Sequence, residues 1–182
     1  ILNLASGGGM AIRFTSLTEQ EWKNYLEEYN YNGPVKEFHH PDPAELVKEY
    51  LRRDAKGDFL RTDPWYITAK LHPIGSGWDQ AYLISGYKTD YLHVDSAHAS
   101  YEVSYDLIAW IRFNLDGPYL TFRPEKKMVR FELENTSWGW RIDRPAQPSH
   151  ILPKVIIHRL SDEDQKELKL YLEQEQLTHL LE

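Results

Sequence analysis

The chain has 182 residues, and 41% of them are hydrophobic, which is enough for one domain with an apolar core and terminal extensions. Its formal net charge of -7 argues against an electrostatic nucleic-acid binder. The absence of cysteine excludes disulfides, thiolate catalysis and thiolate metal ligands. No apolar run approaches the roughly 20 residues that a membrane-spanning helix requires, so no membrane span is expected.

Residues 1–9, which end in Gly7-Gly8-Gly9, are set apart from the fold and allow two interpretations. The favoured one is a linker ahead of a natural start at Met10. The other is the mature end left after processing of an export signal. The compartment therefore stays open between cytoplasmic and bacterial extracytoplasmic, and in the second case the chain would belong to a larger envelope assembly.

A short helix is expected in the N-terminal extension, residues 10–34. Thr18-Glu19-Gln20-Glu21 has the pattern of a capping box, in which side chains of the first turn bond free backbone N–H groups. The helix should lie on the body of the protein through one apolar face. That face contains Trp22, Tyr25, Leu26 and Tyr29 at helical spacing.

A second, longer helix is predicted from Pro43 to about Gly57. Asp42 is a suitable N-cap, proline is tolerated at the first helical position, and glycine favours the C-terminal end. For residues 59–77, which carry several prolines and glycines, we expect a short helical turn and irregular structure. The helical residues spaced to face the core are Leu46, Val47, Tyr50, Leu51 and Asp54.

From residue 80 the apolar period changes from helical to two, which predicts long strands. Ser85-Gly86 in the first strand suggests a bulge. Turns at residues 95–97 and 116–118 should begin a second and a third strand. The first strand should place on one face Ala81, Leu83, Ser85 and Tyr87. The second should place on one face Tyr101, Val103, Tyr105, Leu107, Ala109 and Ile111.

The third and fourth strands are predicted between Lys127 and Arg144. The third should face the core with Val129, Phe131 and Leu133, and the solvent with Arg130, Glu132 and Glu134. The fourth should place Trp138, Trp140 and Ile142 on one side, and Arg141 and Asp143 on the other. Residues 155–157 form either a short edge strand or a helical turn. Ser161 should then cap a final helix with an inner side of Leu168, Tyr171 and Leu172.

Helices followed by a meander of bent antiparallel strands define an α+β protein with the helices packed on one concave face. The chain resembles the nuclear-transport-factor-2-like superfamily, also called SnoaL-like. The resemblance rests on the helix at 43–57, on the strands that begin near Tyr101 and Met128, and on the closing strand Gly139-Trp140-Arg141-Ile142-Asp143. The resemblance implies a cone-shaped, cystatin-like fold in residues 35–160, with N-terminal helices on a strongly bent antiparallel sheet. The irregular segment 63–78 and the extra C-terminal helix, residues 161–182, depart from the minimal family pattern.

The resemblance also implies a cavity between the sheet and the helices. Some members use it for isomerisation, dehydration, cyclisation or epoxide hydrolysis through Asp, His or Tyr groups, and others are binding or assembly modules without activity. In this chain Asp54 is the candidate general base, because it continues the buried stripe near the negative end of a helix dipole. The favoured alternative is a structural ion pair with Arg53, Arg61 or Arg141.

Further residues are candidates for lining this cavity or binding a ligand. A tyrosine phenol or Arg141 could stabilise a developing oxyanion, and Phe131 with two tryptophans could floor an apolar pocket. Core packing is the favoured interpretation for these aromatic residues. The full set of candidates is Tyr50, Asp54, Tyr87, Tyr105, Phe131, Trp138, Trp140 and Arg141.

No metal or other cofactor is expected. His93 and Asp95 share a face of a strand, but His98 lies beyond a turn and no third ligand accompanies them. The pair His39-His40 precedes a helix and should be exposed, and His150 is isolated. The chain also lacks the motifs GxSxG, GxxxxGK[ST] and GxGxxG of α/β serine hydrolases, P-loop NTPases and Rossmann enzymes.

Two functions therefore compete. The favoured hypothesis is a non-catalytic module that binds a small apolar ligand or a protein partner. It includes a homodimer formed through the outer sheet face, where Arg130, Glu132 and Glu134 form a polar row. The alternative is a cavity enzyme of the isomerase, dehydratase or hydrolase type, with Asp54 as base and a tyrosine or Arg141 as oxyanion stabiliser.

Overall fold

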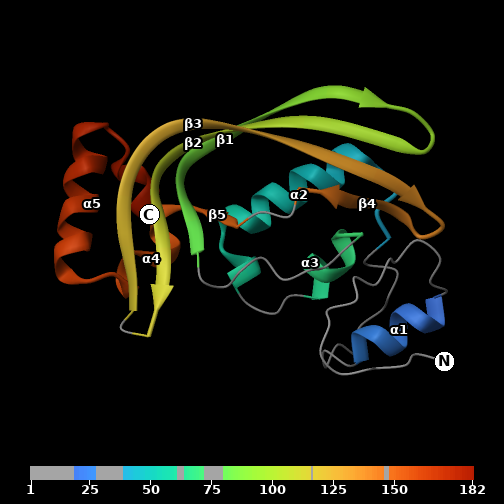
Figure 1. Cartoon of the computed structure of the whole chain (residues 1–182), viewed down its shortest axis with the longest axis horizontal. Coiled ribbons are helices and arrows are strands. Elements are labelled where there is room, and N and C mark those ends of the chain that lie inside the picture. The colour runs from blue at the N-terminus through green and yellow to red at the C-terminus, as the bar shows by residue number, and fades with distance from the viewer. Residues whose placement is uncertain (1–18, 28–38, 61–63, 72–79, 116, 146–147) are drawn as a thin grey trace.

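A computed structural model of the chain describes residues 19–27, 39–60, 64–71, 80–115, 117–145 and 148–182. The architecture is α+β, as predicted, with helices gathered around a curled five-stranded sheet (Figure 1). The strands are β1 Gln80–Val94, β2 His98–Asn114, β3 Gly117–Thr136, β4 Gly139–Arg144 and β5 Ser149–Ile151. The α-helices are α1 Glu19–Glu27, α2 Pro43–Ala55, α3 Pro64–Ala69, α4 Pro153–Ile156 and α5 Asp162–Gln174. The 3₁₀ helices are η2 Asp58–Leu60, η3 Ile157–Arg159 and η4 Thr178–Leu181.

The sheet is a meander with one added strand. β1 to β4 are antiparallel neighbours in chain order, and β5 joins the far edge, which gives the order β4-β3-β2-β1-β5. β5 runs parallel to β1 and pairs only with residues 81–83. The prediction of a wholly antiparallel sheet is therefore wrong at this edge. A strand of three residues is too short to show a period in the sequence.

α2 forms where it was predicted. Its N-cap Asp42 accepts hydrogen bonds from the backbone N–H of Ala44 at 2.8 Å and of Glu45 at 3.4 Å. These bonds satisfy two of the free donors at the start of the helix. Gly57 follows the helix with a φ of 74°, a conformation that glycine adopts without strain. The predicted inward stripe is confirmed, because all its members are buried: Leu46, Val47, Tyr50, Leu51 and Asp54.

α2 lies across the concave side of the sheet and contacts both edge strands (Figure 1). Just before the helix, the His40 carbonyl accepts the backbone N–H of Trp140 in β4 at 2.7 Å. At the end of the helix, the Ala55 carbonyl accepts the backbone N–H of Leu152, just after β5, at 3.0 Å. The segment therefore links the two edges of the sheet, which curls around it as a half-barrel.

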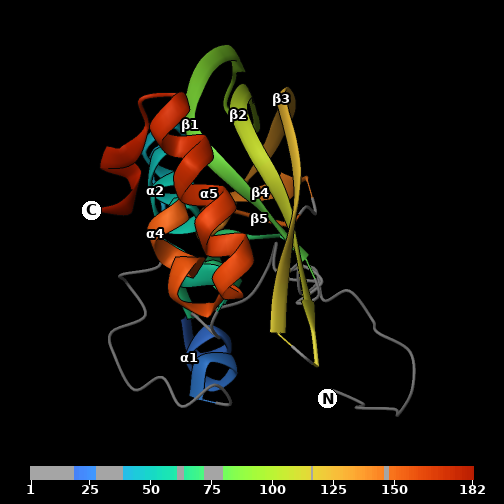
Figure 2. The ribbon, with the colours of Figure 1, turned by 90° about the vertical axis from the view of Figure 1, so that its left-hand side faces the viewer.

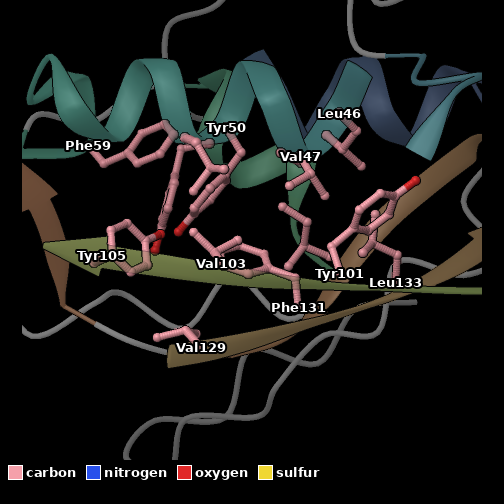
Figure 3. Close-up of a cluster of buried hydrophobic side chains, with 14 of the residues drawn as sticks. Leu46, Val47, Tyr50, Phe59, Tyr101, Val103, Tyr105, Val129, Phe131 and Leu133 are labelled. Atoms are coloured by element: carbon pink, nitrogen blue, oxygen red, sulfur yellow. The ribbon is translucent and has the colours of Figure 1, made fainter. Parts of the chain in front are cut away.

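Two apolar clusters lie on opposite faces of the sheet. The first fills the space between α2 and the concave face, where side chains of the helix and of the strands point toward one another (Figure 3). The second lies on the outer face, where α5 covers the curved end of the strands (Figure 2). Leu168 and Leu172 of α5 are fully buried there and Tyr171 is partly buried, which confirms the predicted inner side of this helix.

A bulge moves the side chains of β2 from one face to the other. A register irregularity separates Leu107 from Ala109 where β2 pairs with β3. The residues before it belong to the concave cluster, and Ala109 and Ile111 belong to the outer cluster. The prediction that all six alternating residues from Tyr101 to Ile111 share one face is therefore wrong, because one extra residue reverses the alternation.

β1 changes face in the same way. The bulge predicted at Ser85-Gly86 is confirmed by a register irregularity between Ile84 and Gly86. Ala81 and Leu83 therefore face the outer cluster, whereas Tyr87 packs against the concave one. The prediction that these three share a face is wrong. By contrast, β3 keeps its predicted alternation, with Val129, Phe131 and Leu133 buried.

The remaining elements agree with the sequence where they are described. Residues 155–157 are helical, within α4 and η3, and are not a strand. Ser161 caps α5 by accepting the backbone N–H of Asp164 at 3.1 Å. α1 falls within the predicted N-terminal helix. The predictions made for residues 1–18, Tyr29 and Arg61, and for the side chains of Trp22, Tyr25 and Leu26, lie outside the described residues.

Gly139 should not tolerate a side chain. Its φ is 88°, and a Cβ there would lie 2.6 Å from the His40 carbonyl oxygen. Gly139→Ala is therefore expected to lower the free energy of unfolding by roughly 2–3 kcal/mol, measured by urea denaturation. Gly86→Ala is the matched control, because nothing lies within 4 Å of the added Cβ. Equal effects of the two substitutions would contradict this explanation.

Candidate functional site

A buried pair of ionisable side chains joins the end of α2 to β5. Asp54 is 1% exposed and His150 is 0% exposed. The Asp54 carboxylate accepts the backbone N–H of His150 at 3.0 Å, and its Oδ2 lies 3.6 Å from the ring Nδ1 of His150. Asp54 therefore points inward as predicted. The contacts found for Asp54 are with His150, and Arg53, one of the arginines considered, pairs with Glu49 at 2.7 Å. Arg61 lies outside the described residues.

The prediction that His150 is isolated is wrong. Its ring stacks on Tyr105 with a centroid separation of 3.8 Å, and on Tyr82 with a separation of 4.8 Å. Burial lowers the pKa of His150, and the nearby Asp54 carboxylate only partly opposes this shift. The buried imidazole is therefore neutral and stacks against two aromatic rings.

A carboxylate beside a neutral imidazole can in principle accept and relay a proton. In this structure both groups are enclosed, and one Asp54 oxygen already holds the backbone of β5. Among the described residues, the other Asp54 oxygen and both ring nitrogens of His150 have no hydrogen-bond partner. The observed contacts make Asp54 a structural connection between α2 and β5, with no exposed face for a substrate.

Tyr50, Tyr105 and Phe131 occupy the space in which a ligand was expected (Figure 3). Each of them is at most 2% exposed. The Tyr50 ring lies 5.5 Å from that of Phe131 and 4.9 Å from that of Phe59, which are ordinary distances for packed aromatic pairs. Burial raises the pKa of Tyr50, and Asp54 adds to the increase. The protein's own aromatic side chains therefore fill this part of the interior.

Arg141 belongs to a second buried polar group, at the β4 edge. Its side chain is fully buried, its Nη1 donates to the Trp140 carbonyl at 2.8 Å, and burial lowers its pKa to about 9. His40 is buried here too, with its ring 5.2 Å from that of Trp65. The prediction that His40 is exposed is therefore wrong. Because these contacts of Arg141 lie at the β4 edge, they do not make it an oxyanion stabiliser for Asp54.

The two tryptophans near β4 are parts of the core and its margin. Trp140 is buried in the concave cluster, as predicted from the alternation of the closing strand. Trp138 is half-buried just before β4, and its ring lies 5.7 Å from that of His39. Trp140 is therefore part of the packed core, and Trp138 lies partly exposed at its margin.

Asp95 organises the turn between β1 and β2. Its Oδ1 accepts the backbone N–H of Ala97 and of His98, each at 2.7 Å, and its Oδ2 lies 3.1 Å from Nε2 of His93. These contacts hold the pKa of Asp95 well below its usual range. The hydrogen bond from the Ala97 N–H has the largest effect, and the one from His93 has the next largest. In the part of the chain that the structure describes, no three His, Cys, Asp or Glu side chains are arranged to hold a metal ion.

Among the described residues, the outer half of β1 is an open sheet edge. β5 covers only residues 81–83, and no other described segment pairs with β1 on that side. From Gly86 to Tyr91 the strand is paired regularly with β2, so alternate backbone donors and acceptors face outward. The end of the strand also exposes apolar side chains: Tyr91 at 63%, Leu92 at 45% and Val94 at 36%.

This edge was not recognised in the sequence, although a signal was present. The candidate Tyr87 is half-buried at the margin of the concave cluster, with its ring 6.3 Å from that of Tyr105. From Lys88 onward, every residue of β1 is exposed. Charged residues in a strand that has lost its buried face are typical of a sheet edge. The loss of alternation after Tyr87 therefore indicates that the strand continues with no described strand on its outer side.

The fold and these sites define an α+β protein with a curled, mixed sheet, a buried aromatic cluster between α2 and the sheet, and, among the described residues, an open edge on β1. No protein-family model, no curated protein and no solved structure matches this chain. Within the described residues, no helix is both long enough and apolar enough to cross a membrane. The function therefore has to be argued from the geometry itself.

Replacing Asp54 should test its structural role. Asp54→Ala leaves the backbone N–H of His150 without its acceptor, and is expected to lower the free energy of unfolding by about 2–4 kcal/mol in urea denaturation. Asp54→Asn retains an oxygen acceptor at the same place and should lose clearly less. If the alanine variant were as stable as the parent protein, the proposed connection between α2 and β5 would be wrong.

Buried histidines should make stability depend on pH. The pKa of His40 is lowered to about 3, first by burial and then by the positive charge of Arg141. As the pH falls through about 6.5, the unfolded chain therefore binds a proton at His40 that the folded protein does not bind. The free energy of unfolding is highest above this pH and decreases as the pH falls further. Between pH 6.5 and 5, the decrease in the free energy of unfolding that is due to His40 should steepen to about 1.4 kcal/mol per pH unit.

His150, whose pKa is also lowered, should act in the same direction. His40→Phe keeps an aromatic ring beside Trp65 and removes the titration. Urea denaturation at several pH values should therefore give a flatter profile for this variant. An identical slope in both proteins would show that His40 is protonated equally in the folded and unfolded states.

Proposed function

We propose that the chain is a non-catalytic module that binds a protein partner through the open edge of β1. The observation that carries the proposal is the stretch from Gly86 to Tyr91, which is paired regularly with β2 and has no strand on its other side among the described residues. An open edge can bind an extended segment of another protein, because main-chain groups supply the hydrogen bonds. The exposed Tyr91, Leu92 and Val94 would add apolar contacts.

The closed interior supports binding at the surface. Tyr50, Tyr105 and Phe131 fill the space between α2 and the sheet, where a small ligand would otherwise bind. The alternative of a cavity enzyme with Asp54 as base has less support, because the carboxylate is enclosed and bonds the backbone of β5. As part of this proposal, the curled sheet around α2 favours a member of the nuclear-transport-factor-2-like superfamily that acts as a binding module.

The edge has features that restrict what can pair with it. Lys88 and Asp90 place charges along it, which disfavours pairing with arbitrary apolar strands. Register irregularities lie on both sides of the regular stretch, between Ile84 and Gly86 and between Tyr91 and His93. Since bulges end regular pairing, only a short segment is available to a partner. A partner must therefore match that segment, which supports specific binding.

The proposal can be tested by replacing Tyr91 with the photo-crosslinking residue p-benzoylphenylalanine in the cells that produce the protein. Irradiation should give a covalent protein adduct at this position, because a partner on the edge would cover the ring. The matched control is the same replacement of Tyr119, an exposed tyrosine of β3. Adducts at neither position, or the same adducts at both, would contradict binding at the β1 edge.

A further inference from the structure

We infer that the partner bound by the β1 edge is a second copy of this chain, an inference that rests on the proposed function. The segment Tyr87-Lys88-Thr89-Asp90-Tyr91 is chemically self-complementary. When two copies pair in antiparallel orientation about a two-fold axis at Thr89, each Tyr87 faces Tyr91 of the other copy. In the same register, each Lys88 faces Asp90, and Thr89 faces its own equivalent. All five residues lie within the regular stretch of β1.

The charges at the edge fit this arrangement. Lys88 and Asp90 are exposed, and neither forms an ion pair with any described residue. Asp90 lies directly opposite Glu102 of β2, and like charges in that relation destabilise a sheet. Lys88 of a second copy would lie on the other side of Asp90. Within the chain, the positively charged neighbour in this row is Arg130 of β3, which lies opposite Glu102. Lys88 of the second copy would give Asp90 a positively charged neighbour of its own, and the two-fold axis makes the contact twice.

The aromatic residues also continue across the interface. The Tyr91 ring lies 6.0 Å from that of Tyr101, and the Tyr87 ring lies 6.3 Å from that of Tyr105, each pair joining β1 to β2. Pairing about Thr89 places Tyr91 of one copy beside Tyr87 of the other. A row of four tyrosines would then run across the concave side, in the order Tyr101, Tyr91, Tyr87, Tyr105. Cross-strand aromatic pairs of this kind stabilise sheets, and the exposed Tyr91 ring would be covered.

Charge disfavours the two registers next to this one. In a continuous sheet with both concave faces on the same side, residues directly opposite each other must point to the same face. One residue must therefore lie opposite its own equivalent, with the two-fold axis between the two. A centre at Lys88 would place two lysines opposite each other, and a centre at Asp90 would place two aspartates opposite each other. Thr89 lies between them. Its side chain is β-branched and uncharged, which suits a direct cross-strand pair.

Charge reversal with rescue provides the test, with sedimentation velocity over a wide concentration range as the measurement. The parent protein should form a concentration-dependent dimer. Lys88→Asp and Asp90→Lys should each weaken dimerisation by about tenfold or more, because like charges then face each other twice. The double variant should recover the parent affinity. Lys169→Asp, an exposed change on α5, is the matched control and should have no effect.

The absence of cysteine allows an independent test of the register. Thr89→Cys should form a disulfide-linked dimer under mild oxidation, since the Cα atoms of directly paired residues lie within disulfide range. Ser104→Cys on β2, away from the edge, should not. A parent protein that stays monomeric, a dimer unaffected by both charge reversals, or equal cross-linking of the two cysteine variants would each overturn the inference.

The failure of this inference can be told apart from the failure of the proposed function. A monomeric parent protein that still gives a Tyr91 adduct with a different protein would leave the edge as a binding site and exclude the second copy. A monomeric protein with no adduct at Tyr91 would contradict both. A dimer that is rescued by the double charge reversal supports both.

Discussion

The attachment of α2 to both edges of the sheet is the constraint on which the rest of this structure depends. At one end the His40 carbonyl binds the backbone of β4, and at the other Asp54 binds the backbone of β5. Because β5 is held at the end of the helix, it can pair only with the first residues of β1. The contact that completes the half-barrel around α2 therefore also leaves the outer half of β1 with β2 as its one strand neighbour among the described residues. The candidate binding edge follows from the position of a buried carboxylate.

Asp54 is well suited to this position even though burying a carboxylate is costly. The backbone N–H of His150 faces α2 in a fully buried place, where an unbonded donor would lose its hydration without compensation. An apolar side chain at residue 54 would fill the space but would leave that donor unpaired. A negatively charged acceptor forms a stronger hydrogen bond than a neutral one, which offsets part of the desolvation of the carboxylate. This explains a buried acidic group without assigning it catalysis.

The sequence predicts the elements that have strong local signals and misses the features that depend on pairing between strands. The Asp42 cap and the helical spacing that follows are local, so α2 and the inward direction of Asp54 could be predicted. The partner of Asp54 is 96 residues away, on a strand too short to show a period, and so it could not be. Similarly, the bulge after Leu107 reverses the alternation of β2, and it has no glycine to mark it, unlike the bulge that was predicted at Ser85-Gly86.

The same irregularities that limit prediction from sequence would limit the growth of an assembly. An open, regular edge is a hazard because each added chain leaves a new edge for the next one. In the proposed two-fold pairing each copy uses the same five residues of β1, so the two β1 edges close on each other. Bulges at Ile84–Gly86 and Tyr91–His93 keep the pairing from extending in either direction. At the opposite side of the sheet, the His40 and Lys70 bridges already cover β4. Residues 117–131 of β3 also have no described strand on their outer side, so the two-fold pairing closes the β1 edge and leaves that part of β3 unchanged.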